Sequence, residues 1–271
     1  MAPQPLAFIT GAAGGIGRAV AAQLHGDGYQ LWLSDHNAEG LAALAQLYPD
    51  AMIDATNLAD PAALETLCTA LEDSAAPIAV GFVNAGMIHP GAVADLPRAV
   101  IDAHIAVNLT AAAHISQALA KRMTRAGTGH IIGTVSAAGM IALPESAAYT
   151  ASKFGLRGYL LSLAQEVRGD GVYVSCIYPN AIDTPMLRYE ARNGGSVLNF
   201  LTSPLEASEI ARAVSRALKG RRLEYHVPRA DYALARFATC FPGVMRPLLP
   251  LLNRLGEKGR LKFLSKIGAG P

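Results

Sequence analysis

The chain has 271 residues and a mass of 28.3 kDa, enough for one large α/β domain, whereas two domains sharing this length would both be small. Hydrophobic residues make up 51% of the sequence and charged residues 16%, which is typical of a sheet covered by helices on both faces. The formal net charge is +2, and we expect no nucleic-acid partner.

Cysteine and histidine usage argues against disulfides and against a metal centre. The three cysteines, Cys68, Cys176 and Cys240, are far apart and in no redox or metal-binding spacing, so we expect reduced thiols. None of the seven histidines belongs to an H-E-x-x-H or cysteine-paired cluster, and we expect no metal. Residues 1–5 lead directly into an apolar run without a basic and hydrophobic leader, which predicts a cytoplasmic protein.

Short apolar runs alternate with stretches of helical periodicity along the chain. The expected strands are Leu6 to Thr10, Gln30 to Ser34, Met52 and Ile53, Ile78 to Val83, Ile131 to Val135, Val172 to Tyr178 and Leu223 to Val227. The expected helices are Ile16 to Leu24, Ala38 to Leu47, Pro61 to Leu71, Pro97 to Arg125, a helix that contains Tyr149 and ends near Val167, and Pro204 to Leu218.

This alternation predicts parallel βαβ crossovers in an α/β fold, a Rossmann-type doubly wound sheet of about seven strands with helices on both faces. We assign residues 1–228 to one dinucleotide-binding and catalytic domain. Residues 229–271 form a basic and apolar helical extension of that domain.

A glycine-rich turn follows the first expected strand and opens the first helix. Gly11, Gly15 and Gly17, with Ile16 between the last two, would let the backbone approach a pyrophosphate closely. The amides at the start of the helix would face the anion. The turn therefore predicts a dinucleotide site.

Asp35 follows the second expected strand, where its carboxylate can accept hydrogen bonds from the ribose hydroxyls of a dinucleotide. The same carboxylate would repel a 2′-phosphate, and neither Ala13 nor Gly14 supplies the basic partner that a phosphate needs. We therefore predict NAD rather than NADP.

Tyr149 and Lys153 stand four residues apart, so a helix places both side chains on one face. A nearby ammonium favours the phenolate, and we expect Lys153 to lower the pKa of Tyr149 toward neutrality, by roughly three units. Ser136 follows an apolar strand and would offer its hydroxyl to a substrate oxygen. These residue types predict proton transfer.

The T-G-x-x-x-G-x-G turn, the sequence Asn84-Ala85-Gly86, Asn108, and the Ser136, Tyr149 and Lys153 set together resemble the short-chain dehydrogenase/reductase family over roughly residues 5–228. The resemblance implies that Tyr149 moves the hydroxyl proton and that Lys153 also binds the nicotinamide ribose. It implies that Asn108 binds a water that links Lys153 to solvent.

The same resemblance assigns further residues to the cofactor. Asp54 and Ala55 match the position that contacts the adenine ring, and the turn from Asn84 to Gly86 lies beside the same sheet edge. Ile182 and Thr184 would address the nicotinamide carboxamide after Pro179. Two departures stand out: Val83 and Asn180 replace the Asn and Gly that are common in the family.

We predict an oxidoreductase that transfers hydride between NAD(H) and a secondary alcohol or ketone. One alternative is an NAD-using epimerase or dehydratase, which would share the dinucleotide residues. Another is a non-catalytic dinucleotide sensor or membrane-associated scaffold, which would not need the set Asn108, Ser136, Tyr149 and Lys153. The expected walls of an apolar substrate pocket are Met87, Ala138, Met140, Leu143 and Met186.

The last fifty residues are basic and apolar. Residues 221–271 carry 10 Lys and Arg against 3 Asp and Glu. The stretch Tyr232 to Leu252 is apolar, but its two arginines and three prolines make a transmembrane helix improbable. We expect short helices that contact an anionic membrane surface or cover the substrate entrance, or else a subunit interface of a homodimer or homotetramer.

Overall fold

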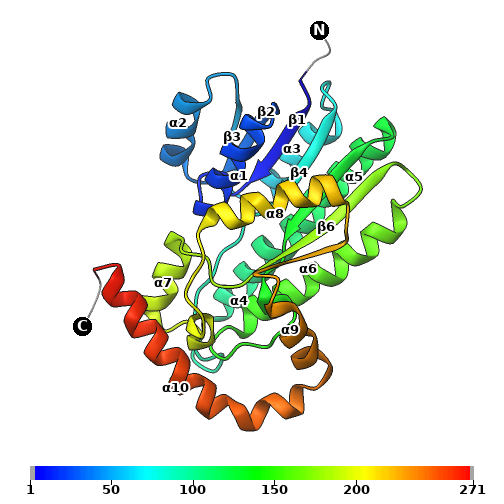
Figure 1. The fold of residues 1–271 in the computed structure, drawn as a ribbon. Coiled ribbons are helices and arrows are strands. Elements are labelled where there is room, and N and C mark those ends of the chain that lie inside the picture. Colours follow the sequence, from blue (N-terminus) through cyan, green and yellow to red (C-terminus); the bar gives the residue numbers. More distant parts are fainter. Residues whose placement is uncertain (1–3, 269–271) are drawn as a thin grey trace.

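The computed structural model describes residues 4–268, apart from the side chains at 231, 232, 234, 242 and 245. Its centre is a seven-stranded sheet in the order β3-β2-β1-β4-β5-β6-β7, with every neighbouring pair parallel (Figure 1). The strands are β1 Leu6–Thr10, β2 Gln30–Asp35, β3 Met52–Ala55, β4 Ile78–Val83, β5 Gly129–Thr134, β6 Val172–Pro179 and β7 Glu224–Val227.

The central strands are buried because successive side chains enter two separate cores. In β1, Leu6 and Phe8 belong to one core, whereas Ala7 and Ile9 belong to the other. All four side chains are fully buried. A strand covered on both faces has a continuous apolar sequence, which is why short apolar runs predicted its position.

Helices cover both faces of the sheet. On one face lie α1 Gly15–Gly26, α2 Ala38–Leu47 and α8 Ala207–Gly220. On the other lie α3 Pro61–Glu72, the long helix formed by α4 Arg98–Ile105, the π-helical η1 Ala106–Ala111 and α5 Ala112–Ala126, and α6 Ala147–Glu166. The predicted Rossmann-type fold is confirmed.

Element boundaries differ from the sequence predictions at a few ends. The long helix predicted from Pro97 to Arg125 is present, but it contains the π-helical turn η1. The helix predicted from Pro204 begins only at Ala207, because Leu205 pairs with Ile182 in an isolated bridge.

The tail packs around the loop that follows β6. That loop contains α7 Pro185–Asn193 and the short η3 Val197–Phe200, and the tail forms α9 Asp231–Cys240 and α10 Pro242–Lys266 (Figure 1). Added Cβ atoms at Gly256 and Gly259 would lie 2.3 and 1.9 Å from backbone oxygens of η3, so the backbones meet directly. Phe263 extends the contact by packing on Phe200.

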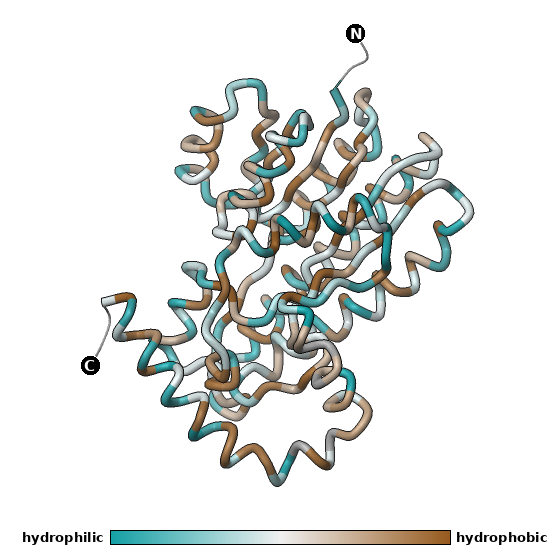
Figure 2. Tube along the Cα trace, viewed as in Figure 1, coloured by the Kyte–Doolittle hydropathy of each residue, from teal (hydrophilic) through white to brown (hydrophobic). Residues whose placement is uncertain are grey.

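Of the described residues, one helix has the length and composition to cross a membrane, and it is Arg98–Ala126 rather than the tail. Its apolar residues Ile115 and Leu119 are fully buried against the sheet. Figure 2 shows brown, apolar positions along the tail helix as well, interrupted by teal ones.

Candidate active site

A cavity of about 550 Å³ lies at the carboxyl ends of the strands. The strand order reverses direction between β1 and β4, and ligands of open α/β sheets bind at such a switch point. The lining runs from Asp35 and Asn57 at one end to Tyr149, Lys153 and Glu190 at the other. A cavity lined by residues from so many strand ends can hold a ligand with two separated ring systems.

The glycines of the first turn make room along this cavity. Gly11 has a φ of +64°, and a Cβ there would lie 2.9 Å from the Cα of Ala85. A Cβ on Gly15 would lie 2.9 Å from Thr184, and one on Gly17 would overlap the carbonyl of Gly11 at 2.1 Å. Gly11, Gly15 and Ile16 line the cavity, whereas Gly17 serves the close packing of the turn.

Gly14, which has no side chain, holds the N-cap position of α1. The first amides of the helix therefore receive no acceptor from the N-cap residue, which leaves them available to an anion. This arrangement, with the glycine cradle, fits the pyrophosphate of a dinucleotide.

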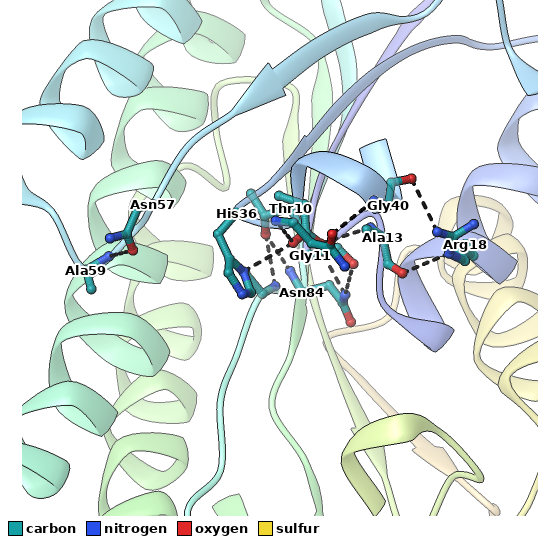
Figure 3. Close-up of polar contacts among 12 residues, drawn as sticks. Thr10, Gly11, Ala13, Arg18, His36, Gly40, Asn57, Ala59 and Asn84 are labelled. Carbon is teal, nitrogen blue, oxygen red and sulfur yellow. Dashed lines mark hydrogen bonds and ion pairs between the residues drawn. The ribbon is translucent and has the colours of Figure 1, made fainter. Parts of the chain in front are cut away.

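Asp35 lines the cavity at the end of β2 and is 8% exposed. Its Oδ2 accepts a hydrogen bond from the amide of Ala13 at 2.9 Å, and its Oδ1 accepts one from the amide of Asn37 at 2.9 Å. His36 lies 3.2 Å from Oδ1, with its own side chain 82% exposed (Figure 3). Arg18, the nearest arginine in sequence, is held by the carbonyls of Ala13 and Gly40 (Figure 3).

Asn84 ties three strand ends together beneath the cavity. Its amide and that of Ala85 donate to the hydroxyl of Thr10 at 2.9 and 3.0 Å (Figure 3). Its side chain donates to the carbonyl of Thr10 and accepts from Thr134 at 3.1 Å. Asn84, Ala85 and Gly86 all line the cavity as predicted.

The adenine end differs slightly from the sequence prediction. Thr56 and Asn57 line the cavity, whereas the two preceding residues, Asp54 and Ala55, are not among its lining residues. The Thr56 hydroxyl donates to a carboxylate oxygen of Asp54, so Asp54 holds a residue of the wall.

Lys153 and Asn108 both lie close to Gly86. A Cβ on Gly86 would lie 3.2 Å from Asn108 Oδ1 and 3.6 Å from Lys153 Nζ. Lys153 is 3% exposed and donates to the carbonyl of Thr134 at 2.9 Å, and burial lowers its pKa to about 8. Asn108 is fully buried in η1, where π-helical turns frequently mark functional sites.

The side chain of Asn108 is hydrogen-bonded to protein groups. Its Oδ1 accepts from the amide of Met87 at 2.8 Å, and its Nδ2 donates to the Met87 carbonyl at 2.9 Å and to Ser152 at 3.2 Å. The side chain therefore fixes Met87, and the water-binding role implied by the resemblance stays a prediction.

Ser136 and Tyr149 face the same part of the cavity. Ser136 has a φ of +101°, a strained conformation for a residue with a side chain. Burial raises the pKa of Tyr149 to about 12, the hydrogen bond with Ser136 opposes the rise, and the charge of Glu190 adds to it. The expected lowering of the Tyr149 pKa by Lys153 is thus wrong for the protein alone, because loss of hydration dominates.

The nicotinamide end comprises the residues after β6. Pro179, Ile182 and Thr184 line the cavity as predicted. Thr184 caps α7 by accepting from the amide of Leu187 at 3.3 Å, and its methyl group lies over Gly15. With the glycine cradle and Asp35, these residues fit a nicotinamide dinucleotide.

Of the predicted substrate residues, Met87, Leu143 and Met186 line the cavity. Ala138 and Met140 do not, because both are buried at 1% and 2% exposure and Met140 packs in the core beneath α6. Both residues were assigned to the pocket only because they follow Ser136 in the sequence. The short helix η2 Ala137–Gly139 turns Ala138 and Met140 toward the core instead.

Three polar residues of the substrate region were not named individually from the sequence, although two of them lie in the loop from Met186 to about Ser203 that we expected to form part of the pocket wall. Glu190 on α7, Asn199 on η3 and Ser146 before α6 all line the cavity. Burial raises the pKa of Glu190 to about 7. None belongs to a local motif, so no sequence signal singled out these side chains.

His104 was also missed. It is fully buried behind Tyr149, with the two rings edge to face at a centroid separation of 6.4 Å. Its Nε2 accepts from the amide of His89 at 3.1 Å and its Nδ1 lies 2.7 Å from the carbonyl of Val100, which fits the neutral ring. Burial lowers the pKa of His104 accordingly.

Comparison with known proteins agrees with this geometry. The family model described as short chain dehydrogenase matches residues 5–194. D-threitol dehydrogenase from Mycolicibacterium smegmatis is 36% identical over 185 residues, covering 67% of this chain and 71% of that protein. The 1-deoxy-11-beta-hydroxypentalenate dehydrogenase of Streptomyces avermitilis is 31% identical, covering 89% of this chain and 90% of that protein.

A solved structure is similar over most of its length. The short-chain dehydrogenase from Sphingobium yanoikuyae in complex with NADPH has a TM-score of 0.76 at 27% identity, covering 91% of this chain and 95% of that one. The match covers a larger share of this chain than the family model does.

Proposed function

This chain belongs to the short-chain dehydrogenase family, and we propose that it transfers hydride between NAD(H) and a secondary alcohol or ketone. The observation that carries the proposal is the convergence of Ser136, Tyr149 and Lys153 on the cavity that the glycine-rich turn opens. A dinucleotide sensor would need the turn but not a phenol, a hydroxyl and a buried ammonium at the far end.

Ser136 and Tyr149 would hold the reacting oxygen. Ser136 and Tyr149 both line this part of the cavity, so a substrate oxygen placed between their hydroxyls would be oriented by both. In alcohol oxidation Tyr149 accepts the hydroxyl proton, and in ketone reduction it donates one to the carbonyl oxygen. The nicotinamide ring, when bound, supplies the hydride chemistry and a positive charge next to the phenol.

Lys153 would assist by electrostatics. Its ammonium lies 5.8 Å from the centre of the Tyr149 ring, and a positive charge at that range favours the phenolate. Because burial holds the pKa of Tyr149 at about 12 in the protein alone, the loss of its proton near neutral pH needs roughly 7 kcal/mol of added stabilisation. We infer that the tyrosine becomes a competent base only with the cofactor site filled.

The choice of NAD rests on Asp35. The related Sphingobium structure holds NADPH, so the cofactor has to be argued from this chain's own residues. Of the described residues that line the cavity, no lysine or arginine lies beside Asp35, and Lys153 belongs to the opposite end. A 2′-phosphate would therefore meet a buried carboxylate without a compensating cation.

The proposal is tested by following NADH absorbance with the purified protein, NAD+ and a panel of aliphatic, alicyclic and aromatic secondary alcohols. We expect oxidation of at least one alcohol, with loss of activity in Tyr149→Phe. NADH that binds in fluorescence titrations without any turnover across the panel, in either direction, would instead support a binding protein.

A further inference from the structure

The carboxyl group of Glu190 lies in the substrate part of the cavity, at a buried position of a kind that apolar residues usually occupy. Glu190 shares the buried face of α7 with Leu187 and Ala191, and it is 6% exposed. Its Oε1 accepts one hydrogen bond, from the side chain of Asn199 at 3.3 Å. Among the described residues no lysine, arginine or histidine forms an ion pair with it.

The surrounding chain accommodates this side chain closely. A Cβ on Gly195 would lie 2.7 Å from the Glu190 Cβ and 2.9 Å from its Oε1, so glycine leaves the space that the carboxylate occupies. Across η3, the tail helix α10 holds the segment that carries Asn199, through Gly256 and Gly259. Burying an acid without a cation is costly, which argues that the group is retained for a ligand.

A second polar group in the same cavity lacks a partner. Ser146 stands at the N-cap position of α6, yet its side chain makes no capping hydrogen bond. It is 3% exposed, and its Oγ has no hydrogen-bond partner among the described residues. Serine at this position normally accepts from an amide of the first turn, so this hydroxyl is left to the cavity that it lines.

We propose that Glu190 and Ser146 bind a second hydroxyl group of the substrate, so that the preferred substrates are diols or hydroxyketones rather than simple apolar alcohols. A hydroxyl can donate to the carboxylate and accept from the serine. A ketone oxygen cannot donate to Glu190, and an ammonium cannot accept from Ser146. The inference rests on the proposed dehydrogenase function and replaces the expectation of a wholly apolar substrate.

The charge balance of the site agrees with a neutral donor. Lys153 already places one buried ammonium in this cavity, and the oxidised cofactor would add a second positive charge. A cationic substrate would meet both, whereas a neutral hydroxyl meets neither. Burial raises the pKa of Glu190 to about 7, and a hydroxyl that donates to its charged form would lower that pKa again.

The test compares matched substrate pairs that differ by one hydroxyl: 2,3-butanediol with 2-butanol, and trans-1,2-cyclohexanediol with cyclohexanol. We expect the unmodified enzyme to prefer the diol by at least tenfold in kcat/KM. Glu190→Leu and Ser146→Ala should each reduce that ratio several-fold, mainly through the KM of the diol, and Glu190→Gln should do so less than Glu190→Leu. Glu65→Gln, an exposed change on α3, is the matched control.

A second measurement separates this inference from the proposed function. The rise in Tm caused by acetoin or 2-butanone is measured with NAD+ present, which needs no turnover. A larger rise with acetoin that disappears in Glu190→Leu supports the inference even if no alcohol is oxidised, a result that would reject only the dehydrogenase function. Equal use of both members of each pair, equal rises in Tm, or an unchanged ratio in Glu190→Leu overturns it.

Discussion

The side chain of Asn108 is paired with the backbone of Met87: Oδ1 accepts from the Met87 amide at 2.8 Å, and Nδ2 donates to the Met87 carbonyl at 2.9 Å. Met87 follows the Asn84 to Gly86 turn and lines the substrate part of the cavity. A buried amide inside a π-helical turn thus fixes one wall of the pocket to the helix that lies behind it.

We predict that Asn108→Asp destabilises the protein by about 2–4 kcal/mol, because a buried oxygen then faces the Met87 carbonyl with no proton to donate. Thermal or urea unfolding measures the change. Asn193→Asp is the matched control, since Asn193 also donates its side-chain amide to a backbone carbonyl, that of Tyr189, but is exposed. An equal loss in both variants would show that burial of the pair contributes nothing.

The cofactor preference depends on Asp35. We predict at least tenfold higher kcat/KM with NAD+ than with NADP+, because a 2′-phosphate beside this carboxylate should cost more than the roughly 1.4 kcal/mol that tenfold represents. Asp35→Ala should erode the preference, and His36→Gln, a change in the exposed neighbour, should preserve it. Equal use of the two cofactors by the unmodified protein would refute the assignment.

Tyr149→Phe should lower kcat by at least about 100-fold and leave NADH affinity within a few-fold, since the ring remains and only the proton-transfer group is lost. Tyr159→Phe, on the same helix, is the control: it removes a hydroxyl that donates to the carbonyl of Ala113 at 3.0 Å. If Tyr149→Phe kept a tenth of the rate, another group would be moving the proton.

The parts of the site that sequence predicted are those whose geometry is local. Gly11 and Gly15 stand within one turn, and Tyr149 and Lys153 stand one helical turn apart, so a strand or helix assignment alone brings them together. The sheet topology followed from alternation in the same way, because burial on both faces gives continuous apolar runs.

The parts that sequence did not predict depend on packing between distant segments. The sequence alone suggests that Glu190 is an exposed polar residue of a surface helix, but α10 and η3 cover that helix in the structure. Met140 was predicted to line the pocket, but its side chain packs in the core. The pKa of Tyr149 was predicted from one neighbouring charge, but its direction is set by burial, which no spacing reveals.

We predict that Glu190 makes the stability of the protein depend on pH. Its pKa rises from 4.5 to about 7 on folding, so the native state prefers the protonated acid and its contribution is lost as pH increases through that range. Glu190→Gln should therefore raise Tm at pH 8 and change it little at pH 4, with a difference of at most about 3 kcal/mol. A variant that is destabilised equally at both pH values would contradict the assigned burial.

The tail presents an exposed apolar face followed by a basic one. Phe241, Val244, Leu248, Leu251 and Leu255 are each about half exposed and are spaced three or four residues apart, which places them on one side of a helix. Lys258, Lys262 and Lys266 continue the same spacing and are exposed. Apolar residues that enter the acyl boundary beside lysines that meet lipid phosphates are typical of an interfacial helix.

We predict that the full chain floats with vesicles that contain phosphatidylglycerol and not with phosphatidylcholine alone, because each lysine contributes about 1 kcal/mol at an anionic surface. Leu248→Glu combined with Leu251→Glu should abolish flotation, since two carboxylates would enter the acyl boundary, while NADH binding persists because neither leucine lines the cavity. Lys219→Glu, an exposed charge change on α8, is the control. Absence of flotation, together with conversion of a dimer to a monomer by the double leucine variant, would identify this face as a subunit interface instead.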